Sequence, residues 1–423
     1  MSLLHLKNSI FFLLLISPAF TLSIKGWSNS VLILLSVACL FDWLFSPNPN
    51  KNFYTKTLTN LDKLLILSLA LPIFVILSTQ ILRHQINLNS YDAPVRLFFA
   101  GLLASYLINQ KIYLTKIKGL FEFSTIVALL STFIFVIIFP QYSEIWGGRF
   151  ATKHADPNAF GVYITALTLL YAGLSVSKIN KLGIFLSLVF LLIGLYMVMG
   201  SQTRGAWISI PFSIIPIFLY SYSRYRHSTK LVLITTLCLV LILYLTNDSL
   251  NSRVNSIFIE AYQWFTNDKM RDTSIGIRFS MWVITWEIGM QKFLTGYGTS
   301  GYAELIQSEF FTSKYSPIVI ETLIKAGPHN EYLANFLRSG ITGFISTLCL
   351  IYAPLFIFYR LYKKTINLSS NPKYAIAGLC FCSSLAVSAL SIEIFTLKYT
   401  ASLYGLTVVA LYVLARKEIY EQK

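Results

Sequence analysis

Long apolar runs follow one another along most of this chain, and they limit its fold more than any other feature. A transmembrane helix needs about 20 apolar residues, because each residue advances about 1.5 Å and the hydrocarbon layer is roughly 30 Å thick. By that measure we predict about twelve transmembrane helices, and hence an all-α polytopic membrane protein. Their expected ranges are 9–24, 30–45, 64–82, 95–110, 119–139, 159–177, 182–200, 206–222, 231–246, 341–359, 374–390 and 397–415.

The composition excludes a water-soluble globule. Hydrophobic residues make up 55% of the 423 residues and charged residues only 12%, whereas soluble domains carry about 25% charged residues. The first apolar run lacks a convincing small-residue cleavage site and leads directly into further runs, so we interpret it as a retained helix. All five cysteines fall inside predicted helices, where we expect small core residues rather than a disulfide framework or a metal site.

The net charge of +16 indicates an orientation in the membrane. In a soluble protein such an excess would suggest nucleic acid as a partner, which we do not expect here. If the N-terminus is cytoplasmic, most of the lysines and arginines between the predicted helices fall in cytoplasmic segments, as the positive-inside rule requires. We therefore predict that both termini are cytoplasmic.

One long polar segment interrupts the alternation of apolar runs and short connections. Residues 247–340 are rich in Tyr and Trp, and they lie on the outer face in the predicted orientation. Within them, residues 276–293 have an amphipathic pattern that places Trp282 and Trp286 on one helical face, suited to the head-group level. We therefore predict three parts: 1–246 with nine transmembrane helices, a large periplasmic loop at 247–340, and 341–423 with the last three helices.

Basic side chains gather in the predicted outer segments. Arg204 lies at the outer mouth of a predicted helix, Arg278 in the amphipathic stretch, and Arg149 and Lys153 in a second outer loop. Taken singly, Arg204 suits a snorkelling residue and Arg278 the solvated face of an interfacial helix. Together they suit a lipid-linked diphosphate, because a guanidinium binds phosphate oxygens bidentately and keeps its charge at any pH.

The stretch GPHNEYLANFLRSG, residues 327–340, is unusually polar for this chain. Pro328 suits the first turn of a helix, so we predict that His329 stands in that turn. A neutral imidazole can accept a proton from a hydroxyl near pH 7, although a lone histidine at a membrane edge is more often structural. We treat Glu331 and Arg338 as a structural pair.

The other polar residues of these outer segments and helix ends are candidate substrate contacts. They are Arg96, Arg149, Lys153, Asn330, Tyr332 and Arg338. The stretch GYGTSG at 296–301 matches the G-x-G-x-x-G pattern, but it follows an amphipathic helix rather than a strand, so we interpret it as a flexible turn and not a dinucleotide site. The sequence has no zinc-protease motif and no Walker loop, and we expect chemistry without a metal or a cofactor.

Four short motifs resemble those of the bacterial O-antigen ligase family. HNEYLANFLRSG resembles the family signature H-[S/N]-x-x-L-x-x-x-x-x-x-G, carried by His329, Asn330, Leu333 and Gly340. SQTRGAW is similar to the family's arginine segment at the mouth of a central helix, and GIRFSMW with FLTGYGTSGY is similar to its second arginine segment and glycine-rich turn. GGRFATKHADPNAFG is similar to an outer segment with arginine and Pro-Asn, in which His154 and Asp156 are local variations.

The resemblance implies a membrane glycosyltransferase with a GT-C-like fold in the bacterial inner membrane and a periplasmic active site. The donor would be a glycan on undecaprenyl diphosphate, and the acceptor a hydroxyl of the lipid A–core oligosaccharide. Arg204 and Arg278 would hold the diphosphate, and His329 would deprotonate the acceptor, with inversion at the anomeric carbon.

Two alternatives stay open beside the ligase. O-antigen polymerases share the architecture and much of the signature, although one large loop near the C-terminal third favours a ligase. A carrier or flippase for lipid-linked sugars would instead show charged or broken helices near the bilayer midplane, often in repeated halves. The polar groups of this chain concentrate in outer loops and helix ends, which favours the enzyme.

Overall fold

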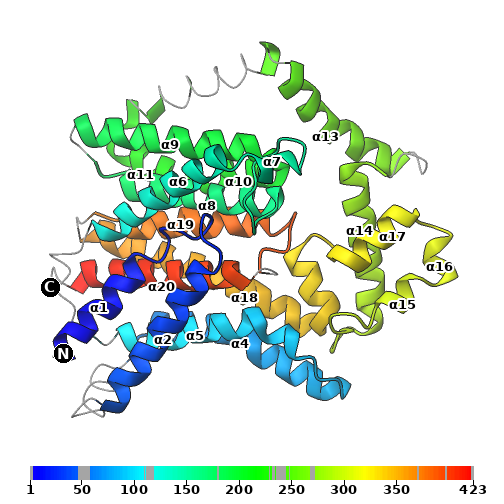
Figure 1. Ribbon diagram of the computed structural model, residues 1–423, viewed down its shortest axis with the longest axis horizontal. Coiled ribbons are helices and arrows are strands. Elements are labelled where there is room, and N and C mark those ends of the chain that lie inside the picture. The colour runs from blue at the N-terminus through cyan, green and yellow to red at the C-terminus, as the bar shows by residue number, and fades with distance from the viewer. Residues whose placement is uncertain are drawn as a thin grey trace. The chain divides into compact units, whose positions relative to one another are not determined.

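The protein is mainly helical in the residues that its structure describes. The computed structural model describes residues 3–45, 58–108, 110, 119–178, 181–227, 229–230, 234, 244–246, 248–266, 272–368, 371–395 and 398–420. Within these ranges every regular element is a helix, and the one β-type pairing is an isolated bridge between Thr152 and Ala155 (Figure 1). The prediction of an all-α chain is confirmed for these residues.

The chain divides into two compact units. The two-segment unit comprises Met1–Ile215 and Ile345–Lys423, and the inserted unit comprises Pro216–Phe344. Helices of the two-segment unit are α1 (Leu3–Leu15), α2 (Trp27–Phe45), α4 (Asn60–Arg83), η1 (Leu88–Tyr91), α5 (Asp92–Ile108), α6 (Leu120–Ile138), α7 (Gln141–Glu144), α8 (Pro157–Ser175), α9 (Lys181–Ser201), α10 (Arg204–Ser213), α19 (Lys373–Ser388) and α20 (Lys398–Tyr420). The division predicted from the sequence, at 246–247 and 340–341, stays a prediction.

Among the described residues, five further helices lie in the inserted unit, and two helices cross its boundaries. Its own helices are α13 (Asp248–Thr266), α14 (Ser274–Gln291), α15 (Ala303–Ile306), α16 (Glu309–Thr312) and α17 (Pro317–Ala326), while α11 (Ile215–Arg224) and α18 (Glu331–Asn367) begin in one unit and end in the other. The backbone of α18 is not helical at Ser339 and Gly340. The predicted helix 341–359 therefore begins directly after this kink.

Eight of the described helical segments are long and apolar enough to cross a membrane. They are Trp27–Phe45, Asn60–Arg83, Leu120–Ile138, Pro157–Ser175, Lys181–Ser201, Arg204–Arg224, Glu331–Asn367 and Tyr399–Ile419. Each overlaps one of the predicted ranges, and together they are characteristic of a multi-pass membrane protein. The segment Arg204–Arg224 contains a break between α10 and α11, next to Pro216, which has no N–H for the helical ladder.

The other four predicted helices differ from expectation. For 9–24 the structure has α1, a helix of 13 residues that ends at Leu15 and is followed by turns through residue 26. Pro18 has no amide hydrogen to continue the ladder, and 13 residues span only about 20 Å. The ranges 95–110 and 374–390 correspond to α5 and α19. These helices have 17 and 16 residues, fewer than the about 20 that a membrane crossing needs. Most of the range 231–246 lies outside the described residues.

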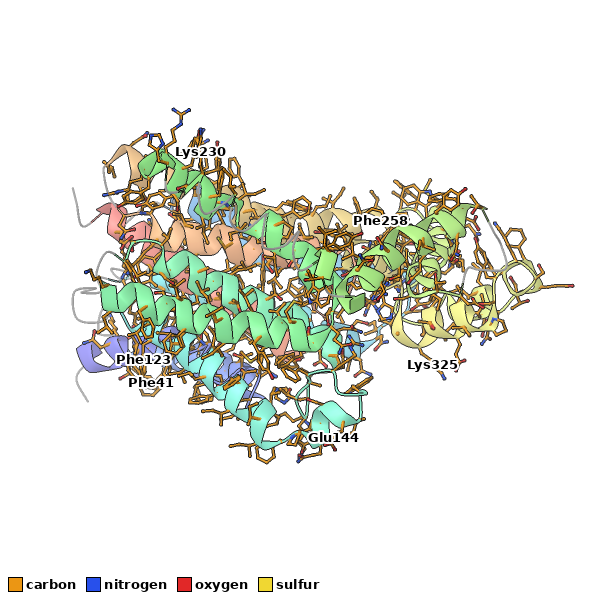
Figure 2. The ribbon with its side chains drawn as sticks, turned by 90° about the horizontal axis from the view of Figure 1, so that it is seen from above. Phe41, Phe123, Glu144, Lys230, Phe258 and Lys325 are labelled. Atoms are coloured by element: carbon orange, nitrogen blue, oxygen red, sulfur yellow. The ribbon has the colours of Figure 1, made fainter. Side chains whose placement is uncertain are left out.

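The centre of the two-segment unit is formed by α8, α19 and α20. Nearly every residue of α8 and α20 is buried, whereas most apolar side chains of α2, α4 and α9 are at least partly exposed. Small residues allow close approach between α8 and α19: a Cβ on Gly173 would lie 2.5 Å from the Cα of Ala377. The exposed rings of Phe41 on α2 and Phe123 on α6 suit contact with lipid (Figure 2).

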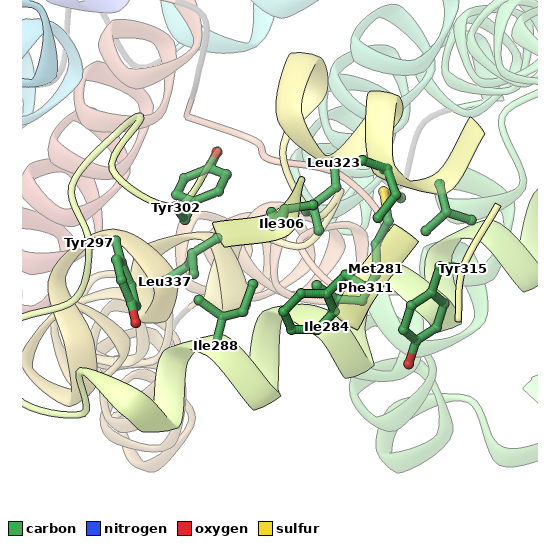
Figure 3. Close-up of a cluster of buried hydrophobic side chains, with 12 residues drawn as sticks. Met281, Ile284, Ile288, Tyr297, Tyr302, Ile306, Phe311, Tyr315, Leu323 and Leu337 are labelled. Atoms are coloured by element: carbon green, nitrogen blue, oxygen red, sulfur yellow. The ribbon is translucent and has the colours of Figure 1, made fainter. Parts of the chain in front are cut away.

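The inserted unit has a hydrophobic core of its own. Side chains from α14 to α18 make up one buried cluster (Figure 3): Met281, Ile284, Ile288, Tyr297, Tyr302, Ile306, Phe311, Tyr315, Val319, Ile320, Leu323 and Leu337. Side-chain caps begin two of its helices, because the Thr273 hydroxyl accepts the Gly276 N–H at 3.1 Å and the Ser316 hydroxyl accepts the Val319 N–H at 3.4 Å. This part of the predicted loop is therefore a packed helical domain.

Candidate active site

His329 stands in a turn just before a helix. The side chain of Asn330 accepts the N–H groups of Tyr332 at 3.0 Å and Leu333 at 3.1 Å, which makes Asn330 the N-cap of α18. The prediction that His329 lies in the first helical turn is wrong, because the asparagine and not Pro328 begins the helix. The preference of asparagine for N-caps was the sequence signal that would have identified this start. As a result, His329 lies outside the helical ladder, and it is half-buried.

The backbone at His329 adopts a left-handed conformation. Among the described residues, three that are not glycine have positive φ: His84 at 53°, Gln202 at 54° and His329 at 49°. His84 ends a helix, but Gln202 and His329 lie in two of the motifs singled out in the sequence. A left-handed conformation costs a residue with a Cβ about 1–2 kcal/mol, and it persists where the surrounding structure imposes it, often at functional sites.

The helix that carries Arg278 also holds the His329 turn. The indole N–H of Trp282 in α14 donates to the carbonyl of Pro328 at 3.0 Å. Arg278 lies one helical turn before Trp282, so the two side chains share a face of α14. Within the inserted unit, the face of α14 that contacts the histidine turn is therefore the face that carries the arginine.

A second set of contacts joins the glycine-rich turn to the kink of α18. The N–H of Tyr297 donates to the carbonyl of Leu337 at 2.8 Å, and that of Gly298 to the carbonyl of Arg338 at 2.9 Å. Both main chains approach so closely that a Cβ on Gly340 would lie 2.4 Å from the Phe293 oxygen. The stretch GYGTSG is thus a turn, as predicted, and its main chain is hydrogen-bonded to the C-terminal end of residues 327–340, the stretch that contains His329.

Arg204 lies at the start of α10, in a turn that the second outer loop holds in place. The guanidinium of Arg149 donates to the Ser201 carbonyl at 3.0 Å and to the Asn158 side-chain oxygen at 3.0 Å. The Thr203 hydroxyl donates to the Pro157 carbonyl at 2.7 Å. The motifs around Arg149 and Arg204, whose arginines are 55 residues apart in the sequence, are therefore neighbours within the two-segment unit.

The remaining candidate residues differ in accessibility. Lys153 is exposed and Arg338 is half-buried, whereas Asn330 and Tyr332 are buried. Glu331, which we expected to pair with Arg338, accepts a hydrogen bond from the Asn335 side chain at 2.8 Å. Arg96 lies apart from these motifs in sequence, at the start of α5, where its Nε donates to Asn29 at 3.2 Å.

His154 is half-buried in an environment that sequence reasoning did not anticipate. Its Nε2 lies 3.4 Å from the carbonyl oxygen of Thr21, and its ring meets the Tyr399 ring edge-on at 5.3 Å. Burial lowers the pKa of His154, and the positive charge of Lys25 lowers it further. The imidazole is therefore neutral at neutral pH and forms part of the packing between the loop before α8 and the start of α20.

The three proposed catalytic residues are divided between the two units. Arg204 belongs to the two-segment unit, and Arg278 and His329 belong to the inserted unit. Their convergence on one substrate stays a prediction. Among the described residues, no group of three or more His, Cys, Asp or Glu side chains has the geometry to hold a metal ion.

Comparison with known proteins gives two findings. Residues 188–348 match a family model described as O-antigen ligase, and this stretch contains Arg204, Arg278 and His329. An uncharacterized protein from Haemophilus influenzae is 26% identical to this chain over 367 residues, which cover 84% of the chain and 85% of that protein. The part of the chain that holds these three residues is therefore similar to the O-antigen ligase family.

Proposed function

We propose that this protein is an O-antigen ligase, a membrane glycosyltransferase that moves a glycan from undecaprenyl diphosphate to a hydroxyl of the lipid A–core oligosaccharide. One observation carries the proposal. The family domain contains both the strained His329 turn and the helix of Arg278, and Trp282 joins the two by a hydrogen bond of 3.0 Å. A half-buried imidazole on a turn that is bonded to an arginine-bearing helix suits the activation of a hydroxyl next to a phosphorylated leaving group.

In the proposed reaction, His329 accepts the proton of the acceptor hydroxyl. The oxygen then attacks the anomeric carbon of the first sugar, the bond between that carbon and the phosphate oxygen breaks, and undecaprenyl diphosphate leaves with the bonding electrons. Attack from the side opposite the leaving group inverts the anomeric configuration. The step needs no cofactor, because the leaving diphosphate already carries its charge.

Arg204 and Arg278 act on the diphosphate in this mechanism. Their guanidinium groups donate to its oxygens and stabilise the charge that develops as the glycosidic bond breaks. Lys153 is exposed and Arg338 is half-buried, and both would donate further hydrogen bonds to the phosphates or the glycan. Three other candidate residues position the catalytic side chains. Arg149 is bonded to the Arg204 turn, and Asn330 and Tyr332 lie at the capped start of α18, next to His329.

We further propose that the protein lies in the inner membrane with both termini in the cytoplasm. The excess of lysine and arginine in alternate connections supports this orientation. It places residues 149–158, the Arg204 turn and residues 247–340 on the periplasmic side, where the lipid-linked donor and the lipid A–core acceptor would meet.

The test is a reconstitution of the purified full-length protein with the undecaprenyl-linked glycan and lipid A–core. We expect His329→Ala to lower the rate of transfer about 10²–10⁴-fold, as for other general bases. Arg204→Ala and Arg278→Ala should each lower it roughly 10²–10³-fold. The matched controls are His227→Ala and Arg226→Ala, which change exposed residues outside the candidate motifs and should leave the rate unchanged.

The products separate the alternatives. Glycan joined to lipid A–core supports the ligase, whereas a longer glycan that stays on its polyprenyl carrier would identify a polymerase. Movement of the lipid-linked glycan across the membrane without any transfer would identify a carrier. Normal transfer by the His329→Ala variant would overturn the role proposed for this histidine.

A further inference from the structure

An open apolar groove runs between α2 and α5 in the two-segment unit. It has a volume of about 680 Å³, and its walls are formed by apolar side chains such as Leu32, Val37 and Leu40 of α2 and Phe99 and Leu102 of α5. Several of these side chains are largely exposed along the groove. Since α2, and α4 which packs against α5, are long and apolar enough to cross a membrane, lipid is the natural occupant of such a surface.

Polar contacts bound the groove at both ends. At one end the Nε of Arg96 donates to the side chain of Asn29 at 3.2 Å, and at the other the Tyr106 hydroxyl donates to Asp42 at 2.6 Å. Asn29 and Asp42 are 13 residues apart on α2, which corresponds to about 20 Å along the helix. One leaflet of the hydrocarbon layer is about 15 Å thick, so the groove is long enough for a single acyl chain that extends from the head-group level.

The groove's first end carries one charge of each sign. Arg96 and Asp92 both line the groove, with 3.6 Å between an Nη1 and a carboxylate oxygen. The hydrogen bonds of Arg96 to described residues use Nε and Nη1, which leaves the two N–H groups of Nη2 for a phosphate. The side chain of Asp92 is 42% exposed, so an ammonium group can reach it.

We propose that the α2–α5 groove binds one acyl chain of a glycerophospholipid whose head group contains a phosphate and a primary ammonium. Arg96 donates to the phosphate, and Asp92 accepts from the ammonium. The carboxylate disfavours a diphosphate, which would place further negative charge beside it. It also disfavours a choline head group, whose quaternary ammonium has no N–H to donate.

The test is native mass spectrometry of the full-length protein, titrated with dioleoyl phospholipids that differ only in head group. We expect phosphatidylethanolamine to bind about tenfold more tightly than phosphatidylcholine or phosphatidylglycerol, because it alone satisfies both charges. Asp92→Asn should remove the preference for ethanolamine over choline, and Asp92→Glu should keep it. Arg96→Gln should weaken binding of all three lipids.

A variant that fills the groove tests the acyl chain. Val37→Trp should reduce binding of every dioleoyl lipid, whereas the control Leu67→Trp, on an exposed position of α4 that does not line the groove, should not. Size-exclusion chromatography of each variant shows that it remains folded and monodisperse. Equal binding of the three lipids by the unchanged protein would overturn the proposal. So would tighter binding of undecaprenyl phosphate at the same groove, or a dimer that dissociates on Val37→Trp.

Discussion

The ion pairs of the two units differ in how far they are buried. In the two-segment unit, Asp62 and Arg416 form a buried pair with nitrogen–oxygen distances of 3.0 Å, and the Tyr412 hydroxyl also donates to Asp62. Their side chains are 0% and 9% exposed. In the inserted unit, Lys325 and Glu321 are paired along the surface of α17 with 71% and 62% of their side chains exposed.

This contrast reflects what surrounds each unit. A transmembrane helix has no water to satisfy a charge, so Asp62 and Arg416 receive partners from α4, α5 and α20, including the Ile108 carbonyl at 3.0 Å from Arg416. The inserted unit is held by an apolar core and by main-chain bonds between turns. Hence the buried charges of the two-segment unit specify its packing. In the inserted unit, the candidate base His329 lies on a turn that a hydrogen bond joins to α14, the helix of Arg278.

The largest expected effect is the loss of one partner of the buried pair. Asp62→Asn or Arg416→Met should lower the free energy of unfolding by about 3–5 kcal/mol, because the remaining group stays buried without its counter-charge. Glu321→Gln in the exposed pair should change it by about 0–1 kcal/mol. Unfolding of the purified protein in detergent measures both. Equal effects at the two pairs would contradict the contrast between the units.

The next effect concerns the contact between main chains at the kink of α18. Gly340 has a φ of 64°, and its added Cβ would lie 2.4 Å from a backbone oxygen, so Gly340→Ala should destabilise the protein by roughly 2–3 kcal/mol. Gly148 has a φ of 81° with no atom within 4 Å, so Gly148→Ala should cost only about 1 kcal/mol. A melting-temperature series on both variants checks the order, and the reverse order would show that the close approach at Gly340 is unimportant.

A third prediction separates backbone strain from chemistry at His329. His329→Gly should be more stable than His329→Ala by up to about 1 kcal/mol, because glycine adopts positive φ without a Cβ penalty. Both variants should lack transferase activity. His84, with a φ of 53° at a helix end, is the control: its Gly and Ala variants should show the same difference in stability and retain activity. Activity in His329→Gly would mean that the turn, and not the imidazole, is required.

A fourth prediction tests the bond between α14 and the histidine turn. Trp282→Phe keeps an aromatic ring but removes the N–H donor to Pro328, and should lower stability by about 1 kcal/mol and transfer by several-fold. Trp286→Phe, on the same helix with a largely exposed ring, is the matched control and should change neither. The idea that Trp282 positions His329 fails if the two variants transfer glycan equally well.

The smallest effect is a pH dependence of the two-segment unit. Because the pKa of His154 is lowered from 6.5 in the folded protein, the unfolded chain binds the proton more readily. Stability should therefore be full above about pH 6.5 and decrease as the pH falls below it. His154→Gln should flatten this slope in unfolding measurements between pH 5 and about 8, while His227→Gln, at an exposed position, should leave it unchanged.

Much of the fold could be predicted from apolar runs. Helices α2, α4, α6, α8 and α9 lie at the predicted ranges to within a few residues, because a run of about 20 apolar residues has few other uses. Prediction was wrong at 9–24, where Pro18 ends the regular helix early. It was also wrong about the helical start at His329, since the asparagine after the histidine caps α18.

The sequence by itself determined that this is an all-α membrane chain, and it identified the short motifs around Arg149, Arg204, Arg278 and His329. Only the tertiary structure decided how these motifs are supported: that Arg149 is bonded to the Arg204 turn, that Trp282 reaches the carbonyl before His329, and that Asp62 finds Arg416 across some 350 residues. Hydropathy depends on neighbours in sequence, whereas a hydrogen bond or ion pair depends on neighbours in space. Distant residues become neighbours only when the helices pack.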